Sequence, residues 1–226
     1  MTMSENRPAG DRDVISELTT SRLSVYLRCL TYLESIHQKT VSSHELAQRF
    51  HLNSAQIRKD LACFGEFGTR GVGYNVSQLK DHLVRELGID RVRNVLIVGA
   101  GNLGMALADY RGFNDKGFQI AALIDVDPGK IGRSSRSGIP VQAYSELRRI
   151  VRERQVEIAI IAVTADSAQE VYDSLAAAGV NAVLNFAPVQ LRAQEGVKLK
   201  SVDLRINLES LSFYLKNVED GRATSE

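Results

Sequence analysis

The stretch Asn94-Val95-Leu96-Ile97-Val98-Gly99-Ala100-Gly101-Asn102-Leu103-Gly104 decides the fold of the larger part of this chain. Its largely apolar first half predicts a buried parallel strand, which runs directly into a G-x-G-x-x-G loop and a helical pattern through Tyr110. A second buried strand, 119–124, ends in Asp125, which lies 21 residues beyond Gly104. This order of strand, glycine loop, helix, strand and acidic residue predicts a dinucleotide site.

Each glycine of the loop has a separate expected task. Gly99 permits the tight turn, Gly101 lets the backbone approach a pyrophosphate, and Gly104 lets the helix pack closely on the strand. The N-terminus of the helix attracts phosphate charge. The alternative interpretation of these glycines is a βα turn with a structural role alone.

The acidic residues after the second strand predict which dinucleotide is bound. Asp125 is expected to accept the adenosine ribose hydroxyls, and Asp127 lies two residues on. Two carboxylates would repel the 2′-phosphate of NADP, so the sequence favours NAD(H). The predicted cofactor-binding residues are Gly99, Ala100, Gly101, Asn102, Leu103, Gly104, Asp125, Asp127, Thr164, Asn185 and Pro188.

Three of those residues come from loops that follow later strands. Thr164 belongs to the loop 164–166, and Asn185 and Pro188 belong to the loop 185–188. These loops are expected at the carboxyl edge of the sheet, where a nicotinamide would lie. Alternatively, either loop only connects two elements.

The rest of the second half alternates between strand and helix patterns. Helices are predicted near 144–153 and at 167–178, strands at 157–163 and 182–186, and a further strand and helix follow. Alternation of this kind predicts an α/β fold, a Rossmann domain with a doubly wound parallel sheet.

The first half of the chain predicts a helix-turn-helix. Apolar residues at three- and four-residue spacing predict a helix over 22–37. Ser42 followed by Glu45 is a capping box, which predicts a second helix from Ser42 to about Phe50. Asn53 followed by Gln56 repeats the signature, so a third helix starts there after a tight turn.

The third helix has a face that suits the major groove of DNA. Arg58 and Lys59 lie on it between small residues, while Ser54 and Gln56 fall in the first turn, where donors can meet phosphates or base edges. The alternative interpretation is a solvated surface helix.

A glycine-punctuated segment, 65–76, follows this helix and predicts a hairpin, the wing of a winged helix. Arg70 and Gly71 are at its expected tip, where a cation can enter a minor groove. Tyr74 is either a core residue or a donor to phosphate. A helix over 77–87 is expected to close this domain.

Composition supports a folded chain with a basic first domain. Apolar residues make up 44% and charged residues 24% of the sequence, and the net charge is +1. Residues 21–93 carry 11 Lys and Arg against 7 Asp and Glu. No secretory signal or long apolar run is present, which favours the cytoplasm. Cys29 and Cys63 lack a metal-site spacing and are expected to be reduced core residues.

These patterns predict five segments. They are an N-terminal tail at 1–19, a winged-helix DNA-binding domain at 20–88, a Rossmann domain at 89–206, a C-terminal helix at 207–218 and a tail at 219–226. The apolar stripe of the last helix is wide, which favours a dimer interface, although an ordinary core helix fits equally.

The residues favour a sensor over an enzyme. All four histidines lie in the first domain, no Tyr-x-x-x-Lys pair occurs, and the Rossmann elements leave no room for a substrate domain. We therefore predict no catalytic residues and no metal site. The alternatives are an NAD-dependent oxidoreductase joined to a nucleic-acid-binding module, and a regulator that binds another nucleotide or CoA.

The sequence resembles the Rex family of redox-sensing transcriptional repressors from about residue 20 to residue 218. The similarity rests on the segments 22–23, 26–28, 57–60, 64–65 and 68–74 in the first half, and on 99–104, 108–110, 125–128 and 185–188 in the second. The resemblance implies a bacterial homodimer that binds palindromic operator DNA when NADH is low and leaves it when NADH binds. It also implies that the C-terminal helix is exchanged between subunits.

The resemblance further implies a switch contact between the domains. By motif, its arginine, tyrosine and aspartate correspond to Arg28, Tyr110 and Asp203. The residues alone allow other roles: a surface cation, a core residue at a helix end and a cap at a strand end.

Overall fold

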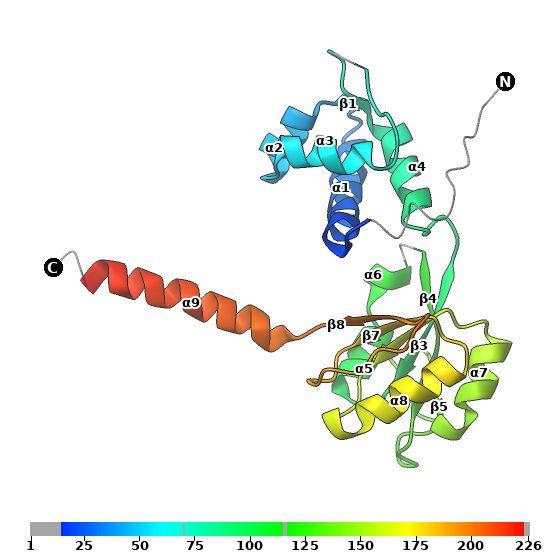
Figure 1. Ribbon diagram of the computed structural model, residues 1–226. Coiled ribbons are helices and arrows are strands. Elements are labelled where there is room, and N and C mark those ends of the chain that lie inside the picture. The colour runs from blue at the N-terminus through cyan, green and yellow to red at the C-terminus, as the bar shows by residue number, and fades with distance from the viewer. Residues whose placement is uncertain (1–14, 70, 115–116, 224–226) are drawn as a thin grey trace, which may run out of the picture. The chain divides into compact units, whose positions relative to one another are not determined.

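The computed structural model describes residues 15–69, 71–114 and 117–223 of the chain (Figure 1). The chain divides into two compact units, Met1–Arg91 and Val92–Glu226. Within the described ranges, no helix is both long enough and apolar enough to span a bilayer. Arg70, the cation predicted at the wing tip, falls outside these ranges.

The first unit contains the helix-turn-helix. Its helices are α1 (Glu17–Ser35), α2 (Ser43–Phe50), α3 (Ser54–Ala62) and α4 (Val76–Glu86), and its strands are β1 (Thr40–Val41) and β2 (Tyr74–Asn75). The core that these helices enclose includes Leu23, Leu30, Ile57 and Leu83, each at most 1% exposed.

The caps that the sequence predicted start α2 and α3. Ser42 Oγ accepts the Glu45 amide at 3.0 Å and Glu45 Oε2 accepts the Ser42 amide at 2.7 Å, which completes the capping box. Asn53 Oδ1 accepts the Gln56 amide at 2.9 Å, but the Gln56 side chain does not return this bond. Its amide nitrogen donates to Asp60 instead, at 2.8 Å.

The predicted hairpin over 65–76 is shorter than expected. The chain reverses between Thr69 and Gly73, whose amide and carbonyl groups pair across the turn. The strand that follows, β2, pairs antiparallel with β1 rather than with the segment before the turn. Strand β1 was not predicted, because a strand of two residues is too short to show an alternation of apolar and polar residues.

Two further expectations for this unit were wrong. Helix α1 begins at Glu17, because Ser16 Oγ accepts the Thr19 amide at 3.1 Å and caps it, five residues before the predicted start. Cys29 is buried as expected, but Cys63 is exposed. Cys63 follows the last helical residue of α3 and continues the outward-facing side that carries Lys59 and Ala62.

A buried aspartate joins the first helix to the third. Asp60 is 2% exposed and accepts hydrogen bonds from Arg22 Nε at 2.6 Å, Tyr26 Oη at 2.8 Å and the Gln56 amide. Burial raises the pKa of Asp60, but the hydrogen bonds from Arg22, Gln56 and Tyr26 outweigh it, so the pKa lies below its usual value. The carboxylate is therefore ionised and fixes the angle at which α3 crosses α1.

The second unit has the predicted Rossmann topology. Its parallel sheet has the order β5 (Val141–Ala143), β4 (Phe118–Asp125), β3 (Arg93–Val98), β6 (Ile158–Ile161), β7 (Ala182–Asn185) and β8 (Lys198–Ser201). The chain winds outward from β3 on one side and returns to its other side, so the direction changes between β3 and β6. Strand β5 was not predicted, because it is only three residues long.

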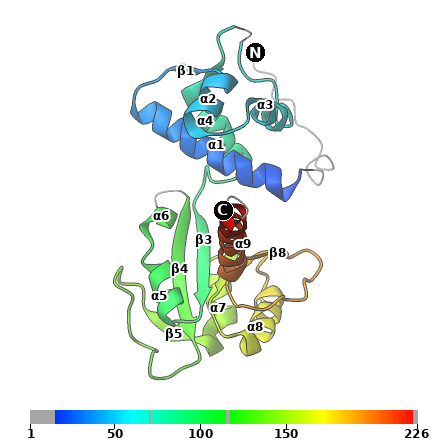
Figure 2. The ribbon, with the colours of Figure 1, turned by 90° about the vertical axis from the view of Figure 1, so that its left-hand side faces the viewer.

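Helices cover both faces of this sheet (Figure 2). Helices α5 (Asn102–Ala108) and α6 (Arg111–Asn114) lie on one face, and α7 (Leu147–Glu153) and α8 (Ala165–Ala177) on the other. A 3-10 turn, η2 (Tyr144–Glu146), precedes α7. Alternate residues of β3 serve the two cores: Val95 and Ile97 pack on the α5 side, Leu96 and Val98 on the α7 and α8 side.

The last helix, α9 (Leu204–Ala223), begins three residues before the predicted 207. Its described side chains, from Leu204 to Lys216, are all exposed. The large apolar ones are 60–64% exposed: Leu204, Ile206, Leu208, Leu211, Phe213, Tyr214 and Leu215. Within a single chain, the described part of α9 is therefore not a core helix, and that interpretation is wrong.

We predict that Asp60→Asn lowers the free energy of unfolding by about 2 kcal/mol, because Arg22 loses its counter-ion and the neutral amide accepts weaker hydrogen bonds. Since the folded-state pKa is lowered, this stabilisation is present at neutral pH and is lost as the pH falls through that value. Thermal unfolding measures it, with Asp81→Asn on the exposed side of α4 as control. Equal midpoints for the two variants would contradict the prediction.

Candidate functional site

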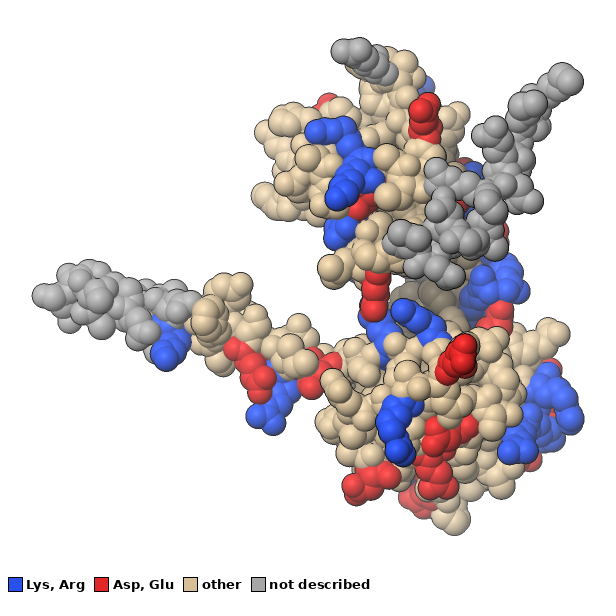
Figure 3. All heavy atoms as spheres, viewed as in Figure 1, with Lys and Arg blue, Asp and Glu red and all other residues tan. Residues whose placement is uncertain are grey.

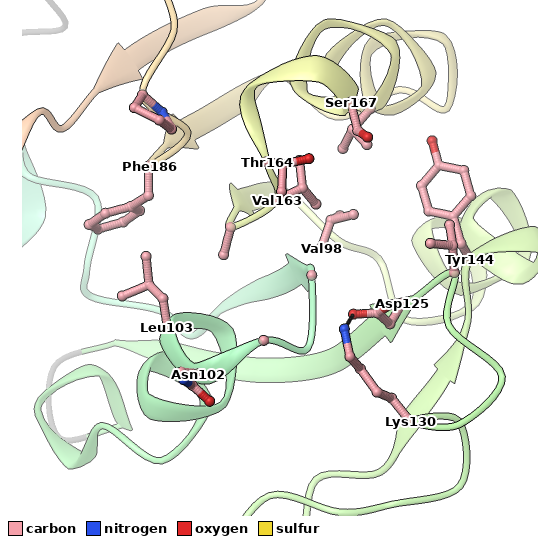
Figure 4. Close-up of a pocket in the computed structure, with 16 residues that line it drawn as sticks. Val98, Asn102, Leu103, Asp125, Lys130, Tyr144, Val163, Thr164, Ser167 and Phe186 are labelled. Atoms are coloured by element: carbon pink, nitrogen blue, oxygen red, sulfur yellow. Dashed lines mark hydrogen bonds and ion pairs between the residues drawn. The ribbon is translucent and has the colours of Figure 1, made fainter.

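A pocket of about 520 Å³ lies where the sheet changes direction, at the carboxyl ends of β3, β4 and β6 (Figure 4). The predicted residues that line it are Gly99, Gly101, Asn102, Leu103, Asp125, Thr164 and Pro188. The other lining residues were not predicted: Val98, Val126, Lys130, Tyr144, Ala162, Val163, Ser167, Val171 and Phe186. Most of the missed residues are apolar, and only the fold brings their strand ends and helices together.

The three glycines of the loop differ in what surrounds them. A Cβ on Gly99, which has φ +104°, would lie 2.4 Å from the Ala162 carbonyl oxygen. A Cβ on Gly104 would lie 1.7 Å from the Gly99 carbonyl oxygen, so helix and turn touch there. Gly101 has nothing within 4 Å of that position. This open space over the N-terminus of α5 suits a phosphate group.

Asp125 is held at the end of β4 by three donors. Its Oδ2 accepts the Ala100 amide at 2.7 Å and Lys130 Nζ at 3.0 Å, and its Oδ1 accepts the Asp127 amide at 2.9 Å. Burial raises the pKa of Asp125, but these three hydrogen bonds outweigh it and hold the pKa below its usual value. The carboxylate is thus ionised and faces the pocket, as a ribose acceptor requires.

Four predicted cofactor residues do not line the pocket. Ala100 is buried and contributes its amide to Asp125, and Gly104 is packed against the turn. Asp127 has a half-exposed side chain whose Oδ1 accepts the Gly129 amide at 2.8 Å. Asn185 is fully buried. All four support the residues that do face the pocket.

Asn185 shapes the loop at the far end of the pocket. Its side chain accepts the Ala187 amide at 2.9 Å and donates to the Val189 carbonyl at 3.0 Å. These bonds hold the loop in a tight path, in which Phe186 and Pro188 both line the pocket. Figure 4 shows the Phe186 ring turned toward it. Asn185 was predicted to bind the cofactor directly. In the structure, its side chain positions the loop that lines the pocket.

Tyr144 contributes a polar group that the sequence analysis missed. Its hydroxyl is buried, and no described residue forms a hydrogen bond with it. Figure 4 shows this hydroxyl on the side of the pocket where Ser167 lies. The residue directly follows β5, so its position became clear only once that short strand was seen.

In the first unit, cations lie on the surface over α2 and α3 (Figure 3). Arg58 and Lys59 are exposed, and Arg58 donates to Ser43 Oγ at 3.0 Å. Arg58, Ser43, Gly71 and Tyr74 line a cleft of about 360 Å³ between the start of α2 and the wing. An arginine beside a helix N-terminus and a glycine-rich turn suits a phosphate backbone.

The other predicted DNA-binding residues are less available. The Gln56 side chain is bonded to Asp60, and Ser54 is partly buried. Tyr74 is 8% exposed and belongs to the core, and burial raises its pKa. Tyr74 therefore packs in the core, as one of its two interpretations expected, and it also lines the cleft beside Arg58.

Comparisons with known proteins identify the chain. Residues 14–62 match the family described as "Putative DNA-binding protein N-terminus", and residues 90–189 match "CoA binding domain". A redox-sensing transcriptional repressor Rex from Streptomyces coelicolor is 50% identical over 209 residues, which cover 92% of this chain and 81% of that protein. The chain belongs to the Rex family.

Other Rex proteins agree in length and in fold. The Rex of Carboxydothermus hydrogenoformans is 51% identical over 89% of this chain and 97% of its own. The Rex-family repressor RSP in complex with NAD⁺ and operator DNA has a TM-score of 0.87 at 34% identity, covering 94% of this chain and 97% of that one. RSP in complex with NADH has a TM-score of 0.82 at 33% identity, covering 93% and 98%.

The resemblance to Rex and the predicted α/β fold with a DNA-binding first domain are thereby confirmed. The relatives from Streptomyces coelicolor and Carboxydothermus hydrogenoformans are both named as transcriptional repressors. No cluster of side chains suited to a metal ion occurs among the described residues.

The three residues expected in the Rex switch are on the surface of their own units. Arg28 is exposed on α1, and Tyr110 is 57% exposed and packs edge-on against Phe113. Asp203 is exposed, and its Oδ1 accepts the Arg205 amide at 2.8 Å at the start of α9. Arg28 and Tyr110 in particular present side chains that a neighbouring surface can contact.

The glycine geometry predicts opposite outcomes for two similar substitutions. Gly101→Ala is expected to fold normally but to bind NADH at least about tenfold more weakly, because its methyl group fills the space for the pyrophosphate. Gly104→Ala is expected to lower the free energy of unfolding by about 3 kcal/mol, because its methyl group overlaps Gly99.

Thermal unfolding and NADH titration separate the two effects. Wild-type NADH affinity in Gly101→Ala would contradict the assignment of this loop to the cofactor.

Proposed function

We propose that this protein binds a palindromic operator while NADH is scarce and leaves the DNA when NADH binds. The observation that carries the proposal is the combination, in one Rex-family chain, of a cationic α3 surface and an open glycine turn facing an ionised Asp125. The RSP structures with operator DNA and with NADH support it by similarity.

The residues proposed to hold NAD(H) follow from the geometry of the pocket. The amides at the start of α5, beside Gly101 and Asn102, receive the pyrophosphate, and Asp125 receives the adenosine ribose. Thr164 and Pro188 lie on the loops after β6 and β7, where the nicotinamide is expected. Four further residues are proposed to position those that contact the cofactor, without contacting it themselves: Ala100, Gly104, Asp127 and Asn185.

We infer that the bound nucleotide is a signal and is not turned over. Among the described residues, the ionisable side chains that line the pocket are Asp125 and Lys130, which are bonded to each other at the end of β4, where the ribose is expected, and Tyr144, whose hydroxyl lies on the side of Ser167 (Figure 4). A hydride transfer needs an acid or base beside the nicotinamide instead. The same proposal places the protein in the cytoplasm, where bacterial operators lie.

For DNA binding, we propose that α3 enters the major groove and that its Arg58 and Lys59 side chains face the DNA. Ser54 and Gly71 are proposed to contact phosphates from the helix start and the wing, and Arg70 to enter the minor groove. Gln56 and Tyr74 are proposed to support this surface, through Asp60 and through the core.

NADH releases the operator only if it binds the two arrangements of the dimer with different affinities. We propose that Arg28, Tyr110 and Asp203 form a contact between the domains in one of these arrangements. NADH and NAD⁺ then compete for one pocket, and their ratio sets the fraction of free operator.

A gel shift tests the function directly. The protein is expected to retard a palindromic, A·T-rich operator duplex, NADH is expected to release it, and NADPH at equal concentration is not. NADH recovered unchanged after the assay supports the signalling role. Retention of the complex at saturating NADH would contradict the proposal.

The matched variant for this assay is Arg58→Ala. Loss of a cation that meets a base edge or phosphate is expected to weaken operator binding by about 1 to 3 kcal/mol and to leave NADH affinity unchanged. Lys198→Ala, an exposed cation on β8, is the control. If both variants bind the operator as the wild type does, α3 does not lie in the groove.

We also propose that α9 forms the interface of a homodimer. An exposed apolar patch of this size on a helix is typical of a protein contact, and two winged helices are needed to read a palindrome. The double variant Leu208→Asp and Leu211→Asp is expected to be monomeric, because two carboxylates are buried without partners. Light scattering measures the mass, with Lys216→Asp as control, and an unchanged dimer would refute this interface.

A further inference from the structure

We propose that Lys130 is a counter-ion of Asp125 that the cofactor must displace, and that its charge limits how strongly the site rejects NADPH. The proposal deepens the proposed function, because it rests on NAD(H) binding in this pocket. It starts from a cation that the sequence prediction left out. Lys130 lines the pocket with 35% of its side chain exposed, beside a carboxylate that is only 7% exposed.

A local turn brings Lys130 back over Asp125. The Asp127 side chain accepts the Gly129 amide at 2.8 Å, and the Asp127 carbonyl accepts the Lys130 amide at 3.0 Å. The chain therefore reverses directly after β4. Lys130 Nζ ends 3.0 Å from Asp125 Oδ2 and 3.9 Å from Asp127 Oδ2, so it lies between the two carboxylates.

The hydrogen bonds that Asp125 already accepts leave too few lone-pair positions for both hydroxyls of a ribose. A carboxylate has about four lone-pair positions. The Ala100 amide, the Asp127 amide and Lys130 Nζ use three of them. A ribose diol brings two hydroxyl donors, and the two amides belong to the backbone. Lys130 is therefore the donor that must give way.

The charge of Lys130 changes the argument for NAD over NADP. Asp125 and Asp127 alone would present two negative charges to a 2′-phosphate. With the positive charge of Lys130 between them, the local net charge is one negative charge. An ammonium displaced from Asp125 remains tethered at the pocket wall, within reach of a group on the ribose. The two carboxylates oppose a 2′-phosphate, and Lys130 offsets part of that opposition.

The experiment compares two cofactors on matched variants. Lys130→Met removes the charge and keeps much of the side-chain length, Lys130→Arg keeps the charge, and Lys198→Met removes a charge from β8 outside the pocket. NADH affinity is measured by titration, and NADPH affinity by displacement of bound NADH up to millimolar concentration. All measurements use the full-length protein at one ionic strength.

The quantity of interest is the Kd for NADPH divided by the Kd for NADH. It is expected to rise on the order of fivefold in Lys130→Met, because the attraction to the 2′-phosphate is lost from a partly exposed position. It is expected to stay near the wild-type value in Lys130→Arg and Lys198→Met. A general loss of folding would weaken both cofactors and leave the ratio unchanged.

The proposal is overturned by an unchanged or smaller ratio in a Lys130→Met protein whose thermal unfolding midpoint matches that of the wild type. It is also overturned if the wild-type protein does not bind NADPH at millimolar concentration. Either result, with NADH still bound tightly, leaves the proposed function standing. A wild-type protein that fails to bind NADH overturns the proposed function itself.

Discussion

The hydrogen bond from the Ala100 amide to the Asp125 carboxylate is the contact on which the nucleotide pocket depends. It ties the glycine turn after β3 to the end of β4, at a distance of 2.7 Å, in a place with almost no access to water. The turn can approach β4 and β6 this closely because Gly99 and Gly104 lack side chains. One buried carboxylate thus orients the turn for a pyrophosphate and is itself held ready for a ribose.

The DNA-binding unit uses the same device. Asp60 accepts hydrogen bonds from Arg22, Tyr26 and Gln56, and so ties α3 to α1 as Asp125 ties the glycine turn to β4. In both units, hydrogen bonds lower the pKa of an aspartate despite its burial, so each carboxylate stays charged at neutral pH. A nucleotide site and a DNA-binding surface each need to keep their shape, and one buried carboxylate serves that purpose in each unit.

The elements with strong local signals were predictable, and the weak ones were not. Caps located the starts of α2 and α3 to within one residue, and the G-x-G-x-x-G loop located β3, α5 and the pocket. The short strands β1 and β5 were missed, because each exists only through its pairing with a distant strand. Gln56 was predicted to face DNA, but a buried carboxylate on its own helix competes for its amide.

Two residues of the pocket, Lys130 and Tyr144, could not be predicted from their local sequence. By sequence, Lys130 is one cation in a polar loop, and Tyr144 is the first residue of a predicted helix. Only the turn after β4 brings the ammonium onto Asp125, and only the pairing of β5 with β4 brings the phenol to the pocket wall.

The sequence by itself determined the Rossmann topology, the glycine turn with its acidic partner, and the cationic third helix, because these depend on periodicity, capping and spacing along the chain. The tertiary structure decided which residues line the pocket, which carboxylates are buried and paired, and which apolar side chains remain exposed on α9. Those properties depend on the distance between groups that are remote in sequence, and local patterns carry no information about that distance.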